Sequence, residues 1–413
     1  MRILQVSDSY PPATGGLERT VQLLARELAH RDHRVDVATL SYPDTPAQES
    51  EGPVTVHRLD GWSRHLRRLS ADPGHHFHPT APDPLLARRL QALVDELHPE
   101  VVHAHGWILH SCLGLRLPPG TALVVTLHDY SLVCANKTMI RHGELDRRCP
   151  GRSLRGCLSC ASGYYGALKG VPLVLGLAQA HHRLDRVALF LPISSAVARA
   201  CLQGVSPDRV AVVPSFVSDD VAAGARAGPR PDFLPDGEFV LFVGALGEHK
   251  GVGLLAEAHR RMTTSAPLVV IGARRADSPA LSGDPRHPLV LRDGVPHREI
   301  MAAFAAAAVV AVPSRWPEPQ GLVAVEAMAS GVPVVASEVG GLAELVLPGE
   351  TGLLVRPGDA GALAGALDQL LGDPALRSRM GTAAKARAVD FTAASIVPRV
   401  IEAYHRARVT TAA

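Results

Sequence analysis

The chain has 413 residues, of which 46% are hydrophobic and 20% are charged, and its formal net charge is +2. This length exceeds what one ordinary hydrophobic core organises and predicts two globular domains. A net charge this small supplies no strong basic field, so nucleic acid is not an expected partner.

The amino-terminal half alternates short apolar runs with helical patterns. Residues 2–7 are typical of a buried parallel strand, and residues 16–30 place Val21, Leu24 and Leu28 on one helical face. Further strand-like runs lie at 34–40, 100–106, 122–129, 187–194 and 209–216. We expect residues 1–217 to form a Rossmann-like domain with a cysteine-rich insertion near residues 130–165.

A stretch rich in Pro, Gly and Asp at 218–237 predicts a linker. Strand-like runs resume at 238–246, 266–273, 287–295, 308–314, 332–337 and 352–358. Residues 238–390 therefore predict a second Rossmann-like domain. Residues 391–413 predict a terminal helix, interrupted at Pro398, that packs back on the first domain. The expected fold class is α/β, with two doubly wound parallel sheets whose strand ends face a shared ligand-binding cleft.

No segment suggests secretion or membrane insertion. The start of the chain, MRILQVSD, lacks the apolar core of a signal peptide, and the apolar run at 300–313 is too short to span a bilayer. We therefore expect a cytoplasmic protein with reduced cysteines, in at most weak peripheral contact with the inner face of a membrane. The arginine-rich residues 64–69 are expected to be a solvated helix face, with a membrane-surface role as the minor alternative.

Two loop-to-helix junctions carry residues suited to an anion. Gly15 and Gly16 enter the first helix, where glycine lets a ligand approach the backbone and free amides favour negative charge. A simple turn with positive φ explains them equally well. Lys250 stands where a helix begins, so its charge opposes the helix dipole unless it faces an anion such as phosphate. Glu248 is the alternative partner for this lysine.

The third junction, residues 313–337, places Glu318 in a loop and Glu326 inside the following helix. Arg315 brings a second cation to this helix start. The amides open to an anion would be those of Gly321, Leu322 and Val323. Glu326 suits a vicinal diol such as a ribose, and Glu318 could accept from another hydroxylated group. An acid near a helix start is stabilising in any protein, which explains Glu326 without a ligand but does not explain Arg315.

The chain resembles glycosyltransferase family 4, retaining enzymes with the GT-B fold, over essentially its whole length. The resemblance rests on PPATGGLE (11–18), TLHD (126–129), and the segments 192–217, 242–252 and 313–346. The last is the most specific, because it is similar to the family's Glu-x7-Glu donor-binding element. The resemblance implies transfer of a sugar from a UDP- or GDP-sugar to the hydroxyl of a small-molecule, glycan or lipid-linked acceptor. It implies no cofactor at the reaction centre.

The resemblance also implies roles for individual residues. Glu326 would hold the ribose, Glu318 would contact the donor sugar, and His128 matches the family's histidine near the transferred sugar. Phosphate contacts would come from Lys250, Gly16 and the amides from Gly321 to Val323. The main catalytic task is then to stabilise the departing diphosphate. Front-face attack is expected, without a covalent nucleophile.

Two positions depart from the family pattern. Ala245 stands where members usually carry an arginine that pairs with the lysine on the diphosphate, and Gln320 stands where an aromatic is common. Because Ala245 replaces this arginine, an impaired or non-catalytic family member remains an alternative. Arg315 is the residue that could compensate for the missing arginine. Recognition of the base is expected within residues 290–300, through backbone groups of Gly294 and Val295.

The insertion contains four cysteines that meet the ligand count of a tetrahedral zinc site: Cys134, Cys149, Cys157 and Cys160. We expect a structural metal there, most naturally zinc and less readily an iron–sulfur cluster. Cys112 and Cys201 are expected to be ordinary buried residues. The histidine-rich stretch 74–79 is expected to be an acceptor-side loop rather than a metal site.

Alternative functions remain open at this level. A nucleotide-sugar epimerase would convert the donor without an acceptor, and a non-catalytic nucleotide-sugar-binding protein would bind the donor without turnover. A phosphorylase is disfavoured because no pyridoxal-binding lysine motif is found. A dehydrogenase is disfavoured because no Gly-x-Gly-x-x-Gly follows the first strand.

Overall fold

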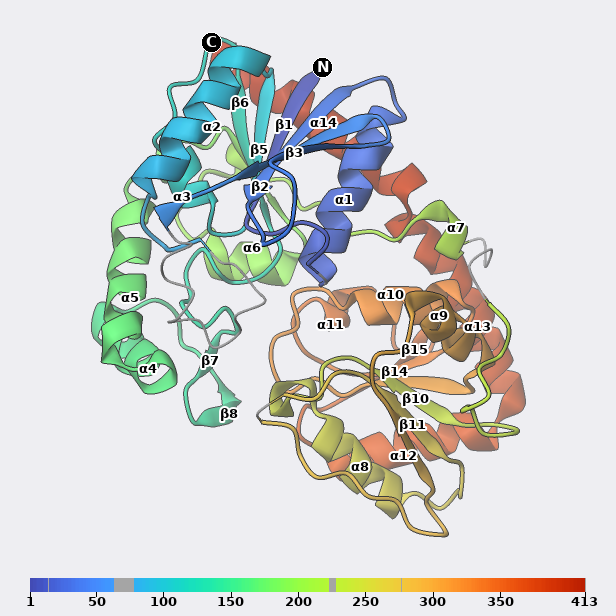
Figure 1. Cartoon of the computed structure of the whole chain (residues 1–413). Coiled ribbons are helices and arrows are strands. Elements are labelled where there is room, and N and C mark those ends of the chain that lie inside the picture. The colour runs from blue at the N-terminus through green and yellow to red at the C-terminus, as the bar shows by residue number, and fades with distance from the viewer. Residues whose placement is uncertain (14, 63–77, 223–227, 276, 413) are drawn as a thin grey trace. The chain divides into compact units, whose positions relative to one another are not determined.

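The computed structural model describes residues 1–13, 15–62, 78–222, 228–275 and 277–412 (Figure 1). The chain divides into two compact units. Unit 1 comprises Met1–His142, Cys149–Ser215 and Ile396–Ala413, and unit 2 comprises Gly143–Arg148 and Phe216–Ser395. Residues 218–237, expected as a linker, therefore group with unit 2, and most of the terminal helix groups with unit 1.

Unit 1 is built on a seven-stranded sheet with the order β3-β4-β2-β1-β5-β6-β9. All pairs are parallel except β3 with β4, which is antiparallel. Its strands are β1 (Arg2–Ser7), β2 (Arg34–Leu40), β3 (Gln48–Glu51), β4 (Val54–Leu59), β5 (Val101–His105), β6 (Ala122–Leu127) and β9 (Leu189–Pro192). Two further short strands, β7 (Ile140–Arg141) and β8 (Glu144–Arg148), pair with each other.

The helices of unit 1 follow the strands in alternation, as a doubly wound sheet requires. They are α1 (Gly16–Ala29), α2 (Pro84–Leu97), α3 (Leu109–Cys112), α4 (Leu154–Tyr165), α5 (Ala167–His181), α6 (Ser195–Cys201) and α14 (Ala393–Ala412). One core cluster joins Leu4 and Val6 of β1 with Leu86 and Leu90 of α2. This core holds the carboxyl ends of β1, β5 and β6 in a fixed order.

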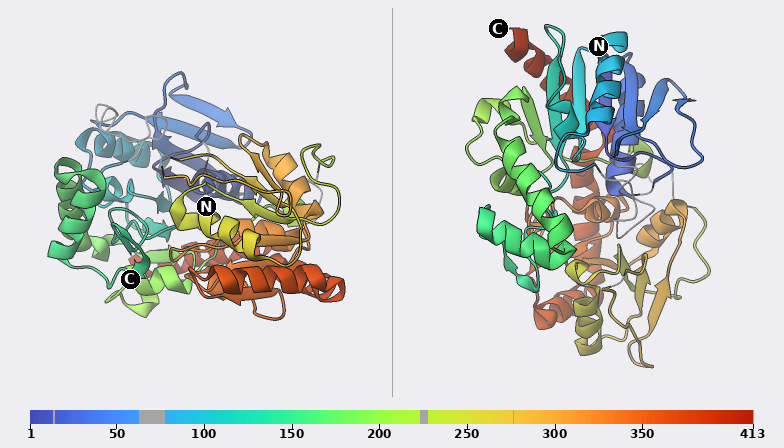
Figure 2. Two further views of the ribbon diagram at one scale, coloured as in Figure 1. Left: turned by 90° about the horizontal axis from the view of Figure 1, so that it is seen from below. Right: turned by 60° about the vertical axis from the view of Figure 1, so that its left-hand side comes forward.

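Unit 2 contains a six-stranded sheet, parallel throughout, with the order β12-β11-β10-β13-β14-β15. Its strands are β10 (Val240–Val243), β11 (Leu268–Ile271), β12 (Leu289–Arg292), β13 (Val309–Val312), β14 (Val334–Ser337) and β15 (Gly352–Val355). Its helices are α7 (Asp219–Ala222), α8 (Val252–Arg261), α9 (His297–Ala306), α10 (Leu322–Ala329), α11 (Leu342–Leu345), α12 (Ala360–Gly372) and α13 (Pro374–Ala388). Figure 2 shows both units from two further directions.

Alternate residues of each strand in unit 2 enter different cores because strand side chains point to opposite faces. Val240 and Phe242 of β10 pack in a cluster with α8 and α12. Leu241, between them, packs in a cluster with α9, α10 and α13. The sheet is therefore buried on both faces, which explains why its strands read as continuous apolar runs.

Two expectations for local structure were wrong. Residues 209–216 run alongside β9, where Ala211 and Val213 donate to its carbonyls, but they form only an isolated bridge at Val210. Pro214 has no N–H to extend this pairing. The terminal helix α14 continues through Pro398 rather than stopping there.

The sequence predicted no segment that is long and apolar enough to span a membrane. Among the helices that the structure describes, none has the length and the apolar content that crossing a bilayer requires.

Candidate functional site

Two loops of unit 2 are held together at the carboxyl ends of neighbouring strands. Gly251, at φ +76°, leads into α8, and a Cβ placed there would lie 1.9 Å from the carbonyl oxygen of Pro313. The backbone N–H of Arg315 donates to the carbonyl of His249 at 2.9 Å. Because β10 and β13 are adjacent in the sheet, the loops that follow them meet without a long excursion.

This contact brings Lys250 and Glu318 together. The ammonium of Lys250 donates to both carboxylate oxygens of Glu318 at 2.9 Å. Ser314 Oγ and Trp316 Nε1 donate to Oε2 of the same carboxylate at 2.9 and 2.8 Å. Glu318 is buried, and the Lys250 side chain is about a quarter exposed. Lys250 therefore pairs with Glu318, and not with the alternative Glu248.

The electrostatics keep this carboxylate charged. Burial alone would raise the pKa of Glu318, but the charge of Lys250 and the hydrogen bonds from Lys250, Ser314 and Trp316 lower the pKa below its ordinary value. The Lys250 nitrogen also lies 4.9 Å from the centre of the Trp316 ring. An ammonium has three N–H groups, so one remains for a further acceptor.

The helix α10 starts beside this ion pair with an uncapped amino terminus. Gly321 adopts φ +98° and offers no side-chain cap. A Cβ at Gly340, where φ is +52°, would lie 2.1 Å from the carbonyl oxygen of Glu318, and the N–H of Gly341 donates to that oxygen at 2.7 Å. The glycine pair after β14 therefore fixes the loop that carries Glu318.

Glu326 lies in α10 and is held by a histidine from another helix. His297 Nε2 lies 2.9 Å from Glu326 Oε1, and the Glu326 side chain is 16% exposed. One oxygen of this carboxylate is thus oriented by His297, at the first residue of α9. The other oxygen is available to accept hydrogen bonds.

The residues expected to contact a nucleobase lie between β12 and α9. The N–H of Gly294, at φ +66°, donates to the carboxylate of Asp293 at 2.7 Å. Val295 is half-buried and packs against the core of unit 2. The Gly294 amide is therefore already engaged with Asp293.

In unit 1, the entry to α1 is occupied by a carboxylate of its own first turn. Gly15 is extended, and a Cβ there would lie 2.3 Å from Glu18 Oε2. Glu18 is buried, and Ser9 Oγ donates to its other oxygen. Gly16 begins the helix directly after this contact. An anion at this terminus would therefore have to displace the Glu18 carboxylate or lie beside it.

Three histidines meet at the carboxyl ends of β5 and β6. His128 Nε2 lies 3.0 Å from Nδ1 of His105, and the rings of His103 and His105 are 4.1 Å apart. His103 also contacts Tyr404 Oη at 2.8 Å and Thr126 Oγ1 at 2.7 Å. Burial, together with neighbouring imidazoles, lowers the pKa of His103 to about 3 and that of His105 well below 6.5. Burial also lowers the pKa of His128 to about 4, so all three rings are neutral near pH 7.

The tautomers of the neutral His105 and His128 rings follow from their hydrogen-bond partners. His105 Nε2 is buried and has no hydrogen-bond partner. A buried acceptor without a partner is tolerated better than a buried N–H without one. We therefore assign the proton of His105 to Nδ1, which donates to Nε2 of His128. The proton of His128 then lies on Nδ1, where it can be donated.

The turn after β5 is fixed by Asp8. Its oxygens accept from the N–H groups of Trp107 and Ile108 at 2.8 and 2.5 Å. A Cβ at Gly106, where φ is +84°, would lie 2.5 Å from this carboxylate. Burial raises the pKa of Asp8 to about 6 despite the opposing effect of Lys137.

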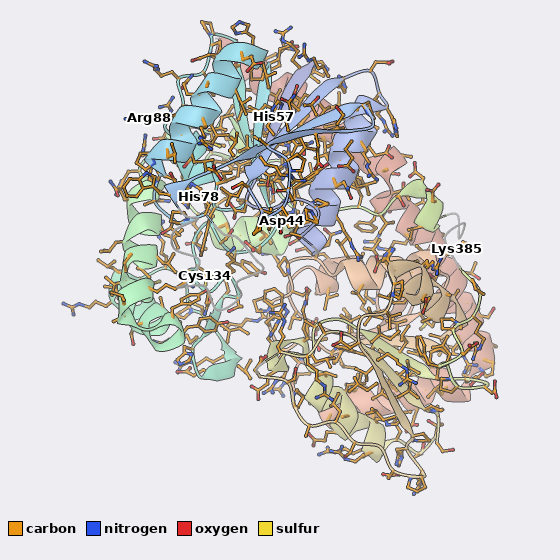
Figure 3. The ribbon with its side chains drawn as sticks, in the orientation of Figure 1. Asp44, His57, His78, Arg88, Cys134 and Lys385 are labelled. Atoms are coloured by element: carbon orange, nitrogen blue, oxygen red, sulfur yellow. The ribbon has the colours of Figure 1, made fainter. Side chains whose placement is uncertain are left out.

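The expected metal cluster is not formed. Within the part of the chain that the structure describes, no three His, Cys, Asp or Glu side chains are placed to hold a metal ion. Instead, the thiol of Cys134 contacts Asn136 Oδ1 at 2.7 Å, and Cys160 accepts from the His142 N–H at 3.3 Å (Cys134 is labelled in Figure 3). Burial raises the pKa of Cys134 to about 11. The zinc and iron–sulfur predictions for Cys134, Cys149, Cys157 and Cys160 are therefore not supported.

Other predicted residues have structural roles. Cys112 and Cys201 are buried as expected. Of the histidine-rich stretch, residues 74–77 lie outside the described residues, as does the arginine-rich stretch 64–69. His78 is buried, with its ring nitrogens 2.6 Å from Ser111 Oγ and from the Pro79 carbonyl (Figure 3).

Several polar residues of these sites were not predicted from the sequence, although some of them had a local signal. Ser314 and Trp316 lie beside Glu318 in a proline-rich loop, and this position could have indicated them as site residues. His103 and His105 alternate at the end of a strand and so share a face, which also was readable. His297 is 29 residues from its partner Glu326, and nothing local in the sequence connects them.

Comparison with known proteins gives the family. Residues 14–221 match the model of Glycosyltransferase Family 4, and residues 230–387 match that of Glycosyl transferases group 1. The D-inositol 3-phosphate glycosyltransferase of Acidothermus cellulolyticus is 31% identical over 417 residues, covering 95% of this chain and 86% of that protein. A glycogen synthase of Mycobacterium tuberculosis is 28% identical over 441 residues, covering 99% and 95%.

Solved structures share the architecture at low sequence identity. Sucrose-phosphate synthase from Thermosynechococcus elongatus matches with a TM-score of 0.69 at 22% identity, covering 98% of both chains. Anabaena HepE in complex with UDP-glucose matches with a TM-score of 0.62 at 18% identity, covering 97% of this chain and 98% of that one. With two parallel-sheet α/β units and matches over nearly its full length, this chain belongs to glycosyltransferase family 4 and is a glycosyltransferase with the GT-B fold.

Proposed function

We propose that this glycosyltransferase moves a sugar from a nucleoside diphosphate sugar to an acceptor hydroxyl, with retention of configuration at the anomeric carbon. The observation that carries the proposal is the arrangement around Glu318. A lysine with one N–H to spare lies beside the uncapped amino terminus of α10, whose next turn carries a second carboxylate, Glu326.

Two kinds of group would bind the phosphates, charged side chains and backbone amides. Lys250 supplies a charge, and the amides of Gly321, Leu322 and Val323 supply the positive end of the α10 dipole. Arg315, in the loop that carries Glu318, adds positive charge in place of the arginine that Ala245 replaces. Gly15 and Gly16, in unit 1, are a further proposed phosphate contact. These groups would stabilise the negative charge of the leaving diphosphate, which is the costly part of glycosyl transfer.

The hydroxyl-binding groups are acceptors and neutral donors. The Glu326 oxygen that does not contact His297 would accept from the ribose diol, and Glu318 would accept from a hydroxyl of the transferred sugar. The Nδ1–H of His128 would donate to the same sugar. We assign no general base, because a departing phosphate oxygen can take the proton of the acceptor hydroxyl in front-face transfer.

We favour a uridine nucleotide as the donor. The solved relative HepE is described in complex with UDP, with UDP and glucose, and with UDP-glucose. The described segment between β12 and α9, with Gly294 and Val295, is the proposed contact for the base.

A combined binding and product experiment tests the proposal. UDP, GDP and their sugars are screened by thermal shift, and a stabilising donor is incubated with candidate acceptors while the product anomer is followed by NMR. We expect a rise in melting temperature with one nucleotide class and an axial or equatorial product that matches the donor anomer. Conversion of the donor alone would indicate an epimerase. Donor binding without any turnover would indicate a non-catalytic binder, and an inverted product would refute the retaining mechanism.

A further inference from the structure

The helices α4 and α5 form a pair at the edge of unit 1 (green in Figures 1 and 2). Gly170 of α5 packs directly on α4, since a Cβ there would lie 2.5 Å from the Ala161 carbonyl. Gly176 lies equally close to Thr80, whose hydroxyl donates to the Leu173 carbonyl at 2.8 Å. The pair is therefore tightly seated on the unit through its inner side.

The inner side of α5 is an apolar stripe with helical spacing. Leu173, Val174 and Leu177 are buried in a cluster with Trp107 and Ala161. This cluster accounts for one face of the helix. A helix with one buried apolar face normally carries polar residues on the other.

The outer side of α5 breaks that rule. Leu168 is 84% exposed and Leu175 is 49% exposed, and Pro172 and Ala178 between and after them are exposed as well. These positions recur every three or four residues, so they lie on one helical face. No residue from 170 to 182 carries a fixed charge. The outer face of α5 is thus an apolar stripe from Leu168 to Leu175, and the exposed polar Gln179 follows on the same face one turn later.

The neighbouring helix also exposes large apolar side chains. Leu154 and Tyr164 of α4 are each 54% exposed. Together with Leu168 and Leu175, they are four of the seven large hydrophobic side chains that are exposed among the described residues. Exposed apolar residues concentrated on one element mark an interaction surface rather than ordinary scatter.

The charge of the segment that forms the pair is mainly positive. Residues 147–184 contain no Asp or Glu. Their cationic residues are Arg147, Arg148, Arg152, Arg155, Lys169 and Arg183. The whole chain is close to neutral, at +2, so this segment is a local concentration of positive charge. Acids flank this segment on both sides: Glu144 pairs with Arg147, and the exposed Asp185 lies near His181. Cations still predominate, and an apolar face bordered mainly by cations is complementary to an anionic lipid surface.

We propose that the outer face of α4 and α5 docks onto the surface of a bilayer that contains anionic lipid. Leu168 and Leu175 enter the boundary between headgroups and acyl chains, and the arginines pair with lipid phosphates. A protein partner would match such a surface with acidic residues in defined positions, whereas a bilayer requires only apolar side chains and positive charge. This docking does not depend on the nucleotide or sugar that the enzyme uses.

Vesicle co-sedimentation of the full chain tests the docking. The vesicles are phosphatidylcholine alone or phosphatidylcholine mixed with phosphatidylglycerol, at low and at physiological salt. We expect binding to the mixed vesicles that weakens with salt, and about tenfold less binding for the double variant Leu168→Glu/Leu175→Glu. Arg152→Glu/Arg155→Glu should lose binding by about the same factor, and the binding that remains should depend less on salt than that of the wild type.

Matched variants control for charge and folding. Val389→Glu/Val409→Glu places the same charges at valines that are 55% and 71% exposed elsewhere. Arg379→Glu/Lys385→Glu reverses two exposed cations of α13 (Lys385 is labelled in Figure 3). Both should bind vesicles like the wild type, and all four variants should keep the wild-type melting temperature. Nucleotide affinity, measured in parallel, reports separately on the proposed enzymatic function.

Three results would overturn the docking. One is a wild-type protein that does not sediment with anionic vesicles. Another is a Leu168→Glu/Leu175→Glu variant that sediments as well as the wild type. The third is a wild-type dimer in light scattering that this variant converts to a monomer, because the stripe would then bind a second copy of the chain.

Discussion

Lys250 and Glu318 lie in loops after different strands of unit 2, and the ammonium of the first contacts both carboxylate oxygens of the second at 2.9 Å. The sequence suggested separate ligands for them, a phosphate and a sugar. In the structure each is the main partner of the other. The proposed phosphate-binding lysine is therefore positioned by the proposed sugar-binding acid, so a change at either residue should affect both functions.

Replacement of the lysine should destabilise unit 2. Lys250→Met leaves the buried Glu318 with only Ser314 and Trp316 as hydrogen-bond donors. Because Lys250 is partly exposed, we expect a loss of about 1–3 kcal/mol in the free energy of unfolding at pH 7, less than for a fully buried pair. Calorimetric melting temperatures measure the loss. Arg379→Met, at an exposed cation, is the control and should change little.

The same pair predicts a dependence on pH. The pKa of Glu318 in the folded protein lies below its ordinary value of 4.5. The stabilisation by the pair is therefore present above pH 4.5 and is lost as the pH falls through the lower, folded pKa. The difference in melting temperature between wild type and Lys250→Met should shrink on acidification below pH 4.5. A difference that stays constant down to pH 3 would argue against a charged Glu318.

Glu326 should matter for nucleotide affinity more than for stability. Glu326→Ala removes the carboxylate proposed to hold the ribose, and about 10–100-fold weaker UDP binding is expected from losing hydrogen bonds to a charged acceptor. His297→Ala removes only the orienting contact and should cost less, about threefold to tenfold. Isothermal titration calorimetry measures both, with the exposed Glu350→Ala as a control. Unchanged UDP affinity in Glu326→Ala would remove this residue from the site.

The sequence predicted every strand of the two main sheets except β3 and β4, because parallel strands are buried on both faces and read as apolar runs. It did not predict β3, whose residues QESE lie at the sheet edge and alternate between exposed and half-buried. The run at 209–216 has the composition of a strand, but Pro214 and a single bridge leave it outside the sheet. Composition therefore predicted most central strands, but it missed the two outer strands β3 and β4 on one side of the unit 1 sheet.

The candidate site divides in the same way. Lys250, Glu318 and Glu326 could be singled out as candidates because loop-to-helix junctions after parallel strands have a known position and chemistry. The pairing of Lys250 with Glu318 could not be predicted, since they are 68 residues apart in the sequence and meet only because β10 and β13 are adjacent in the folded sheet. The metal site predicted at the four cysteines is not supported for a related reason, because a ligand count does not fix the directions of the thiols. Sequence thus indicates which residues carry chemistry but not which ones pair.

His128 should affect turnover more than donor binding. His128→Ala removes the proposed donor to the transferred sugar, while the nucleotide contacts of unit 2 stay intact. We expect kcat to fall by about 100-fold, the scale of one positioned polar group at a reaction centre, with UDP affinity within about threefold of wild type. Steady-state kinetics and calorimetry separate the two effects. A larger loss of UDP affinity than of kcat would place His128 at the nucleotide instead.

The histidine cluster should make unit 1 sensitive to acid. Burial and the neighbouring His128 lower the pKa of His103 to about 3, from an ordinary value of 6.5. The unfolded chain therefore binds a proton below pH 6.5 that the folded chain does not, and stability falls as the pH drops from 6.5 toward 3. Between pH 6.5 and 5, one such histidine contributes a loss of about 2 kcal/mol. Replacement with glutamine, which can keep both hydrogen bonds, should make this decline shallower.

Melting temperature against pH for wild type and His103→Gln checks this effect. The control is His30→Gln, an exposed histidine at the end of α1, which should leave the slope unchanged. Parallel curves for wild type and His103→Gln would mean that His103 titrates normally.

The junction at Gly251 should be the most sensitive backbone position near the proposed donor site. Gly251→Ala places a Cβ 1.9 Å from the Pro313 carbonyl oxygen, at φ +76°, so the loop that carries Glu318 has to move. The strain of φ alone costs about 1 kcal/mol, and Gly349→Ala, at φ +79° with open space around it, isolates that cost. We expect Gly251→Ala to lose about 2–4 kcal/mol in the free energy of unfolding and about tenfold in UDP affinity. Gly349→Ala should lose only the strain and keep its affinity, because no site residue adjoins it. Equal losses in the two variants would show that the contact between the two loops does not position the site.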